Sequence, residues 1–360
     1  MIGIQHMPAE SEWKPFLKKC VIAVGGGKGG TGKSLLATNL GIALAELRQN
    51  VILIDLDLGG ANLHTCLGIR SAEATLGDFL QKKAEHLEKI LLPTPVDRLK
   101  FINGSNDPLE IANLPYTRKV RLIKHIKQLQ ADYIILDLGG GTSLNVLDFF
   151  LSADYGIVVA TPEPTSMENV SLFIKCFMMR HLKILLKQFP ISNLKNRIKD
   201  PRNRDTLRTF TDLLRLIRSF DQGTAGKIEK KLEGFKFGLI LNMLREHGET
   251  RIGGAYKSMI NRCMGIQMDH LGQIYYDEKI PLAVKNFEPF MVKYPHTKAS
   301  HSIRLTAKRI LGIDHLSSTL HQWPPLFAPK HTERSEPAAS DTLAEKSLKE
   351  KRAKGLRFYL

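Results

Sequence analysis

The chain has 360 residues, a formal net charge of +16 and an isoelectric point near 9.6, and this length is enough for one large core or two smaller ones. Hydrophobic residues make up 43% and charged residues 24%, the balance of an ordinary soluble globular protein. No apolar run approaches the roughly 20 residues of a membrane span, and the N-terminus lacks the apolar stretch of a secretory signal. The four cysteines form no C-x-x-C pair, so neither a disulfide framework nor a closed metal site is indicated, and we expect a cytoplasmic setting.

The first predicted element is a short strand that ends in a glycine-rich loop. After a polar lead-in of residues 1–19, the apolar run Val21–Val24 predicts a buried strand. Residues 27–34 read GKGGTGKS and fit the pattern G-x-x-x-x-G-K-[ST] of a phosphate-binding loop, or P-loop. From Leu35 onward, apolar residues recur at helical spacing. This order of strand, loop and helix is the context that the motif requires, and a glycine-rich turn without a ligand is the alternative.

Each residue type in this loop suits the binding of phosphate. Glycines allow successive N–H groups to point at one anion, and the start of the following helix adds a favourable dipole. The Lys33 ammonium can reach the outer phosphates, and the Ser34 hydroxyl can coordinate Mg²⁺. The predicted phosphate-binding residues are Gly27, Lys28, Gly29, Gly30, Thr31, Gly32, Lys33 and Ser34.

Two later strands end in carboxylates. Val51–Leu56 predicts a buried strand that carries Asp55 and is followed by Asp57. Residues 132–137 predict a second buried strand, which ends at Asp137 and runs into three glycines. Ligands bind at the carboxyl ends of parallel strands, and an acid at this place can hold the water shell of Mg²⁺. Simple turn formation is the alternative for Asp55 and Asp57.

The remaining elements alternate between helix and strand. Helices are expected at 117–130, after Ser166 and at 297–311, and strands at 99–103, 155–160, 237–241 and 267–274. This alternation predicts an α/β fold with a doubly wound, mostly parallel sheet flanked by helices. Thr165 or Ser166 is expected to cap the long helix that follows.

Together these motifs resemble the MinD/ParA family of P-loop ATPases, over about residues 21–312. The loop K-G-G-T-G-K-S carries a second lysine, Lys28, as in the deviant Walker A box of that family. Residues 55–63 match D-x-D-x-G-x-x-N-L, which is similar to the family's switch I, especially in FlhG. The resemblance implies the fold of the SIMIBI class of P-loop NTPases, with ATP and Mg²⁺ as ligands.

The same resemblance implies a role for each charged residue. Lys28 would reach across an ATP-bound homodimer to the partner's nucleotide, while Lys33 neutralises phosphate charge. Asp57 would position the attacking water. Ser34, Asp55 and Asp137 would lie at the magnesium ion.

The resemblance also points to residues around the base. Asn242 follows the strand predicted at 237–241, where the family has an asparagine that recognises adenine. Pro281 belongs to an I-P segment that borders the base in the family. A local turn hydrogen bond is the alternative for Asn242.

A basic insertion distinguishes this chain from MinD, which it otherwise resembles. Residues 175–236 contain 16 Lys or Arg against 6 Asp or Glu, and so carry +10 of the total charge. One interpretation is a helical pair with a solvated basic face. The other is a docking surface for DNA, lipid head groups or an acidic partner.

The domain prediction follows from these boundaries. Residues 20–313 are expected to form the ATPase domain, with the basic insertion at about 176–234. Residues 314–360 are expected to form a Pro- and Ser-containing linker and a basic tail. MinD relatives end in a basic amphipathic helix that binds membrane, but the apolar stripe is thin here. The N-terminal D-Q-A segment of FlhG is also absent.

The leading hypothesis is a MinD/FlhG-like ATPase that dimerises with ATP and acts as a positional switch at a division site, flagellum or cell pole. An unknown protein would activate it, and the cytoplasmic protein could also lie on the inner face of the plasma membrane. The alternatives are a ParA-like DNA-partitioning ATPase, an Mrp-type iron–sulfur carrier, and an amide-forming synthetase that shares the fold.

Overall fold

The computed structural model describes residues 19–57, 60–70, 74–104, 114–189, 210–245, 250–264, 266 and 268–313. The predicted lead-in up to residue 18, the centre of the basic insertion and the whole predicted tail lie outside these ranges. All the described residues belong to one unit, Met1–Thr319. None of the helices within the described ranges combines the length and the apolar character needed to cross a membrane.

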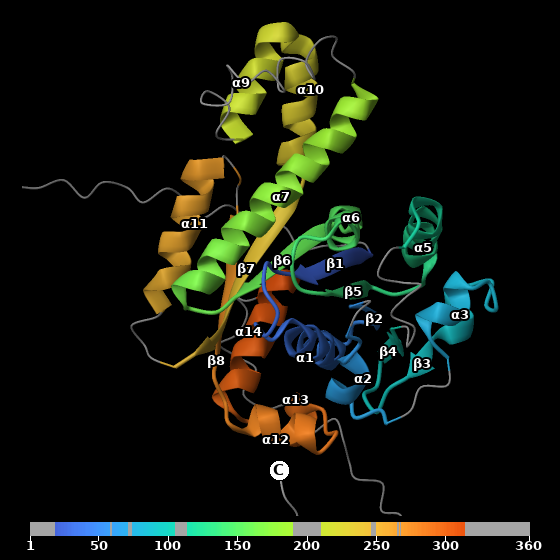
Figure 1. Ribbon diagram of the computed structural model, residues 1–360. Helices are drawn as coiled ribbons and strands as arrows, with labels where there is room; N and C mark the ends of the chain where they lie inside the picture. The colour runs from blue at the N-terminus through green and yellow to red at the C-terminus, as the bar shows by residue number, and fades with distance from the viewer. Residues whose placement is uncertain are drawn as a thin grey trace, which may run out of the picture. The chain divides into compact units, whose positions relative to one another are not determined.

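An eight-stranded sheet forms the centre of this unit, in the order β3-β4-β2-β5-β1-β6-β7-β8 (Figure 1). The strands are β1 Cys20–Gly25, β2 Val51–Leu56, β3 Leu92–Pro93, β4 Leu99–Ile102, β5 Tyr133–Leu138, β6 Tyr155–Ala160, β7 Lys236–Leu244 and β8 Met268–Tyr275. Neighbouring strands are parallel, except that β3 and β4 are antiparallel. The mostly parallel sheet of the prediction is therefore confirmed, with β1 between β5 and β6.

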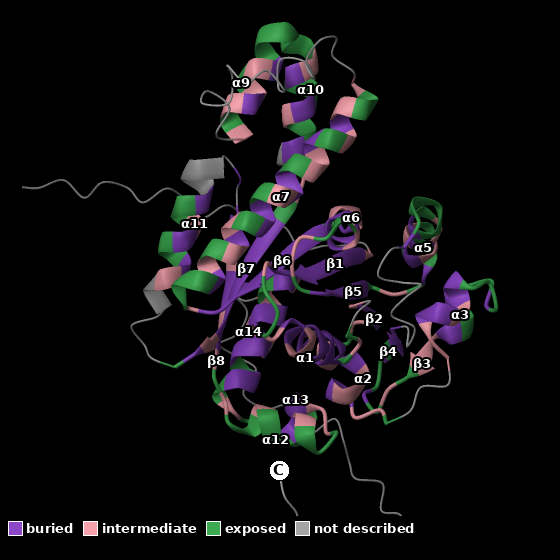
Figure 2. Cartoon of the chain, in the orientation of Figure 1, coloured by how far each residue is buried: buried purple, intermediate pink, exposed green. Residues whose placement is uncertain are grey.

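Helices cover both faces of the sheet. They are α1 Lys33–Glu46, α2 Leu63–Cys66, α3 Leu76–Leu80, the 3-10 helix η1 Leu87–Ile90, α5 Tyr116–Gln128, α6 Leu144–Ser152, α7 Pro164–Gln188, α9 Phe210–Phe220, α10 Gln222–Glu233, α11 Thr250–Met264, α12 Lys279–Lys285, α13 Phe290–Lys293 and α14 Lys298–Leu311. Alternate strand residues point to opposite faces, so Val21 and Ala23 of β1 join the core with α5, α6 and α7, while Ile22 joins the core with α1 and α14. Both faces of β1 are therefore buried, as Figure 2 shows for the central strands.

The predicted strands and long helices are confirmed, and β2 and β6 begin and end at the predicted residues. The helix α6 was not predicted, because its buried residues from Val146 to Phe150 are consecutive and show no helical period. The predicted cap of α7 is wrong. Glu163 is the N-cap residue, and the Ser166 hydroxyl instead accepts a hydrogen bond from the backbone N–H of Thr161 at 3.0 Å.

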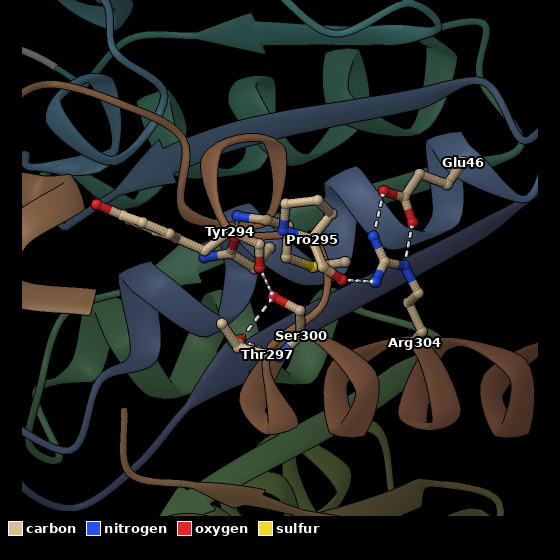
Figure 3. A network of polar contacts seen from close by, with 8 residues as sticks. Glu46, Tyr294, Pro295, Thr297, Ser300 and Arg304 are labelled. Carbon is tan, nitrogen blue, oxygen red and sulfur yellow. Dashed lines mark hydrogen bonds and ion pairs between the residues drawn. The ribbon is translucent and has the colours of Figure 1, made fainter. Parts of the chain in front are cut away.

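The helix that follows the P-loop is anchored at its far end. Arg304 of α14 donates two hydrogen bonds to the Glu46 carboxylate at the end of α1, at 2.7 and 2.9 Å, and a third to the Pro295 carbonyl (Figure 3). Ser300 donates to the Tyr294 carbonyl at 2.7 Å and so holds the loop that leads into α14. Arg304 thus ties the C-terminal end of α1 to α14.

The basic insertion is helical where it is described. Its helices α9 and α10 pack on each other and on the end of α7, and their buried apolar residues are Leu213, Ile217, Ala225, Ile228 and Leu232. Part of the basic charge is paired within the insertion: Arg215 with Asp212 at 2.8 Å and Arg218 with Glu229 at 2.6 Å. Exposed lysines also line the outer side of α7, at positions 175, 183 and 187.

A buried ion-pair network ties α5, α6 and α7 together. The Asp148 carboxylate of α6 accepts hydrogen bonds from Lys119 Nζ at 2.6 Å and from Arg180 Nε at 2.7 Å. Burial alone would raise the pKa of Asp148, but the hydrogen bonds and charges of Arg180 and Lys119 outweigh it and hold this pKa below its ordinary value. The network thus fixes α6, which follows the glycine-rich segment after β5, against the long helix α7.

Asp148→Ala is expected to lower the free energy of unfolding by about 3–5 kcal/mol at pH 7, because it leaves Lys119 and Arg180 without their buried partner. The folded-state pKa of Asp148 is depressed, so its contribution is present above the unfolded pKa of about 3.9 and is lost as the pH falls through the lower folded value. Urea unfolding at pH 7 and near pH 3 measures both effects. The matched control is Glu85→Ala, which breaks the exposed pair with Lys89 and should cost about 1 kcal/mol or less. Equal losses in the two variants would contradict this account.

Candidate functional site

The carboxyl ends of three neighbouring strands bring two predicted acids to the P-loop. Asp55 of β2 lies beside Asp137 of β5 in the parallel register, and Asp137 lies beside Val24 of β1. Asp55 and Asp137 are both 0% exposed. The loop begins where β1 ends, at Gly25, so both acids lie under it at one edge of the sheet.

The P-loop has the backbone conformation that its glycines allow. Gly30 and Gly32 have φ angles of 79° and 83°, in the left-handed region that other residues rarely adopt. Gly32 is the N-cap residue of α1, and no side chain caps this helix. The first N–H groups of a helix have no acceptor within the helix, so the start of α1 can donate to an anion.

Lys33 is held inside the site, whereas Lys28 lies at its surface. The Lys33 side chain is only 7% exposed, and its Nζ donates to the Lys28 carbonyl at 3.0 Å. Burial lowers the pKa of Lys33, and the charges of Asp137 and Asp57 oppose this shift. The Lys28 side chain is exposed, so it is available to a second molecule.

The buried carboxylates fit a magnesium ion. Burial raises the pKa of Asp137 well above its ordinary value; the charge of Asp55 adds to this rise, and Ser34 and Lys33 oppose it. Among the described residues, neither carboxylate oxygen of Asp137 has a hydrogen-bond partner of acceptable geometry. A buried carboxylate without a partner is costly, and carboxylate and hydroxyl oxygens are ligands that Mg²⁺ prefers.

Asp55 is buried in the same way but has backbone partners. Its two oxygens accept hydrogen bonds from the N–H groups of Asp57 and Leu63, each at 3.1 Å. Burial raises the pKa of Asp55 to about 7, against the opposing effect of these hydrogen bonds. Asp55 thus shapes the loop that carries Asp57, which is half-buried beside it.

The glycines after β5 allow two loops to touch. A Cβ atom on Gly140 would lie 2.9 Å from the backbone nitrogen of Gly29, and one on Gly139 would lie 2.8 Å from Asp57 Oδ1. The backbone N–H of Gly141 donates to the Gly26 carbonyl at 3.2 Å. Any movement of this glycine segment would therefore change its contacts with the P-loop and with Asp57.

The two predicted base-binding residues have different surroundings. Asn242 is 3% exposed, and its Nδ2 donates to the Thr31 carbonyl at 2.9 Å. This partner is distant in sequence, so the local turn hydrogen bond considered as an alternative is not what the structure contains. Pro281 lies on the exposed side of α12, a short helix that packs on α2 and α13.

Two features of the site were missed by the sequence reasoning. Asn103 follows β4 at the same edge of the sheet, is 5% exposed, and has no partner for its Oδ1 among the described residues. A Cβ atom on the next residue, Gly104, would lie 3.2 Å from Asp55 Cγ. The available signal was the one used for the aspartates, namely a polar residue directly after a buried strand.

The sequence matches one family model and is similar to proteins named FleN and MinD. A family model described as ParA, the NUBPL iron-transfer P-loop NTPase, matches residues 18–195. The antiactivator FleN of Pseudomonas aeruginosa is 25% identical over 292 residues, which cover 81% of this chain and 85% of that protein. The septum site-determining protein MinD of Bacillus subtilis is 24% identical over 292 residues, covering 81% of this chain and 88% of MinD.

The fold is shared with a solved structure. The septum site-determining protein MinD of Pyrococcus horikoshii OT3, complexed with Mg-ADP, superposes with a TM-score of 0.57 at 22% identity, covering 81% of this chain and 96% of that one. The parallel sheet and the loop at its centre define a P-loop NTPase. Residues 18–195 thus form a ParA-family domain, and most of the chain is similar to FleN and MinD.

Proposed function

We propose that this protein binds and hydrolyses ATP with Mg²⁺ and uses the bound state as a switch. The observation that carries the proposal is the buried carboxylate of Asp137 beside Lys33 and the P-loop, whose oxygens have no hydrogen-bond partner of acceptable geometry among the described residues. A cation bound to a phosphate chain would satisfy this carboxylate, and the first turn of α1 would supply N–H donors to the phosphates. The solved MinD structure that shares this fold contains Mg-ADP.

Each residue of the site has a defined task in this proposal. Ser34 and Asp137 would hold the magnesium ion, directly or through water, while Asp55 keeps the adjoining loop in place. The ion would neutralise charge on the phosphates. Lys33 would do the same from the protein side, and Asp57 would orient the attacking water.

The exposed position of Lys28 supports a dimer as the hydrolysing species. Lys33 lies against its own P-loop, but Lys28 extends from the surface of the site. In a homodimer with the two sites facing each other, Lys28 could reach the partner's phosphates. ATP would then favour the dimer, and hydrolysis, stimulated by an unidentified protein, would release it.

We further propose that the switch positions a larger assembly on a surface. The relatives include a septum site-determining protein and an antiactivator, and a solved structure with this fold is a MinC:MinD complex. The exposed lysines of α7 favour an anionic partner. The leading candidate for this partner is the anionic inner face of the plasma membrane. The second candidate is DNA, as for ParA proteins.

Co-sedimentation of the full chain with anionic liposomes and with DNA, each with ATP or ADP, tests this part of the proposal. Retention on liposomes only with ATP is the expected result. ATP-dependent retention on DNA, falling steeply with salt, would favour the partitioning role instead. Equal sedimentation with ATP and ADP on both would contradict the switch.

An iron–sulfur carrier role is less well supported, although the matching family model is named for iron transfer. Such a role needs accessible thiols that a dimer can share. Burial raises the pKa of the Cys20 and Cys66 thiols to about 12 each, which makes them poor metal ligands.

A further inference from the structure

A single side chain from the far end of the sequence supports the P-loop. Asn242, close to the end of β7, donates its Nδ2 to the backbone carbonyl of Thr31 at 2.9 Å, and this contact is buried. Thr31 lies within the phosphate-binding loop, between Gly30 and Gly32, which both have left-handed backbone angles. The hydrogen bond therefore links the middle of the loop to a strand of the sheet.

The local geometry of β7 makes this contact possible. Consecutive residues of a strand normally point to opposite faces, but the pairing of β7 with β8 is irregular between Leu241 and Leu244. Within this irregularity Met243 has a φ angle of 63°, which is rare for a residue with a long side chain. A Cβ atom on Gly32 would lie 2.4 Å from Asn242 Nδ2 and 3.3 Å from Met243 Cε. Both neighbouring side chains thus reach the same point of the loop.

The hydrogen bond also fixes the direction of a loop N–H group. The peptide between Thr31 and Gly32 is planar and trans, so its C=O and N–H point in opposite directions. With the Thr31 oxygen held toward β7, the Gly32 N–H is directed away from that strand. A group that sets this direction affects how the loop presents its donors to an anion.

We propose that Asn242 is a positioning residue that holds the P-loop in its phosphate-binding conformation, with Met243 as a second support beneath Gly32. This inference rests on the proposed function, because it assumes that the loop binds phosphate. It differs from the adenine-recognition role predicted for Asn242, because it ties the residue to the phosphates and not to the base. Backbone strain at Met243 is consistent with a functional site, where such strain is often retained.

The test compares a ligand that has a base with one that has none. Mg-ATP and inorganic tripolyphosphate with Mg²⁺ are titrated calorimetrically into the full chain, its Asn242→Leu variant and the control Gln128→Ala, which removes an exposed amide on α5. Leucine has the same branching at Cγ as asparagine but no donor. Loss of a buried hydrogen bond predicts that the variant binds both ligands about tenfold more weakly, with the control unchanged.

The possible outcomes separate the two roles. Weakening confined to Mg-ATP would overturn the inference and restore base recognition. Unchanged affinity for both ligands, with only a lower unfolding temperature, would also overturn it, because the role would then be purely structural. Asn242→Ala, which removes the donor without adding a charge, provides the same test if the leucine variant does not fold. Failure of the unaltered chain to bind either ligand would instead reject the proposed function.

Discussion

Lys33→Ala is expected to raise the dissociation constant for Mg-ATP by about 100-fold or more. The Lys33 side chain is 7% exposed and lies where the charges of Asp137 and Asp57 act on it. Its removal takes away the cation nearest the phosphates and leaves two carboxylates facing them. The cost of deleting one member of a buried charged group is therefore added to the loss of the phosphate contact.

Equilibrium binding of a fluorescent ATP analogue measures this effect. Lys227→Ala, in the exposed part of α10, is the matched control and should bind as the unaltered chain does. Circular dichroism checks that both variants are folded. A dissociation constant for Lys33→Ala within about threefold of the original, less than 1 kcal/mol, would contradict the assigned site.

Lys28→Ala is expected to have the opposite pattern, with binding retained and turnover lost. The Lys28 side chain is exposed, and the Lys33 ammonium bonds only to its backbone carbonyl, which the substitution keeps. The dissociation constant for Mg-ATP should therefore change by about threefold or less. A cation supplied in trans during phosphoryl transfer is worth about a factor of 1,000 or more in rate, so ATP hydrolysis should fall by at least about 100-fold.

Phosphate-release assays over a range of protein concentrations measure ATP hydrolysis. Light scattering in the presence of ATP follows dimer formation. Lys175→Ala, an exposed lysine on α7, is the control for a change of surface charge. Unchanged ATPase activity in Lys28→Ala would contradict the proposal that Lys28 acts on the partner's nucleotide, but it would not contradict the assigned binding site.

Much of the fold was predictable because its signals are local. The apolar runs of β2, before Asp55, and of β6 are bounded by polar residues, so the ends of these strands could be read directly. Asp55 and Asp137 could be placed together, since parallel strands end at one edge of a sheet, and the register puts them side by side.

Other features depend on contacts that no local pattern encodes. The hydrogen bond from Asn242 to Thr31 joins residues 211 positions apart, and it depends on an irregular strand end that the apolar run of β7 does not reveal. No sequence pattern marked Asp148, which lies in a helix that was not predicted. In the structure it forms buried ion pairs with Lys119 and Arg180. This ion-pair network depends on how α5, α6 and α7 pack together, so it could not be predicted from any one segment of the sequence.

Isothermal titration calorimetry of the full chain with ATP and Mg²⁺ tests the central claim most directly. The account predicts a saturable heat with one site per chain, whose affinity falls by about 100-fold or more in Lys33→Ala and is preserved in Lys28→Ala. Absence of any binding heat from the unaltered chain with adenine nucleotide and magnesium would contradict it.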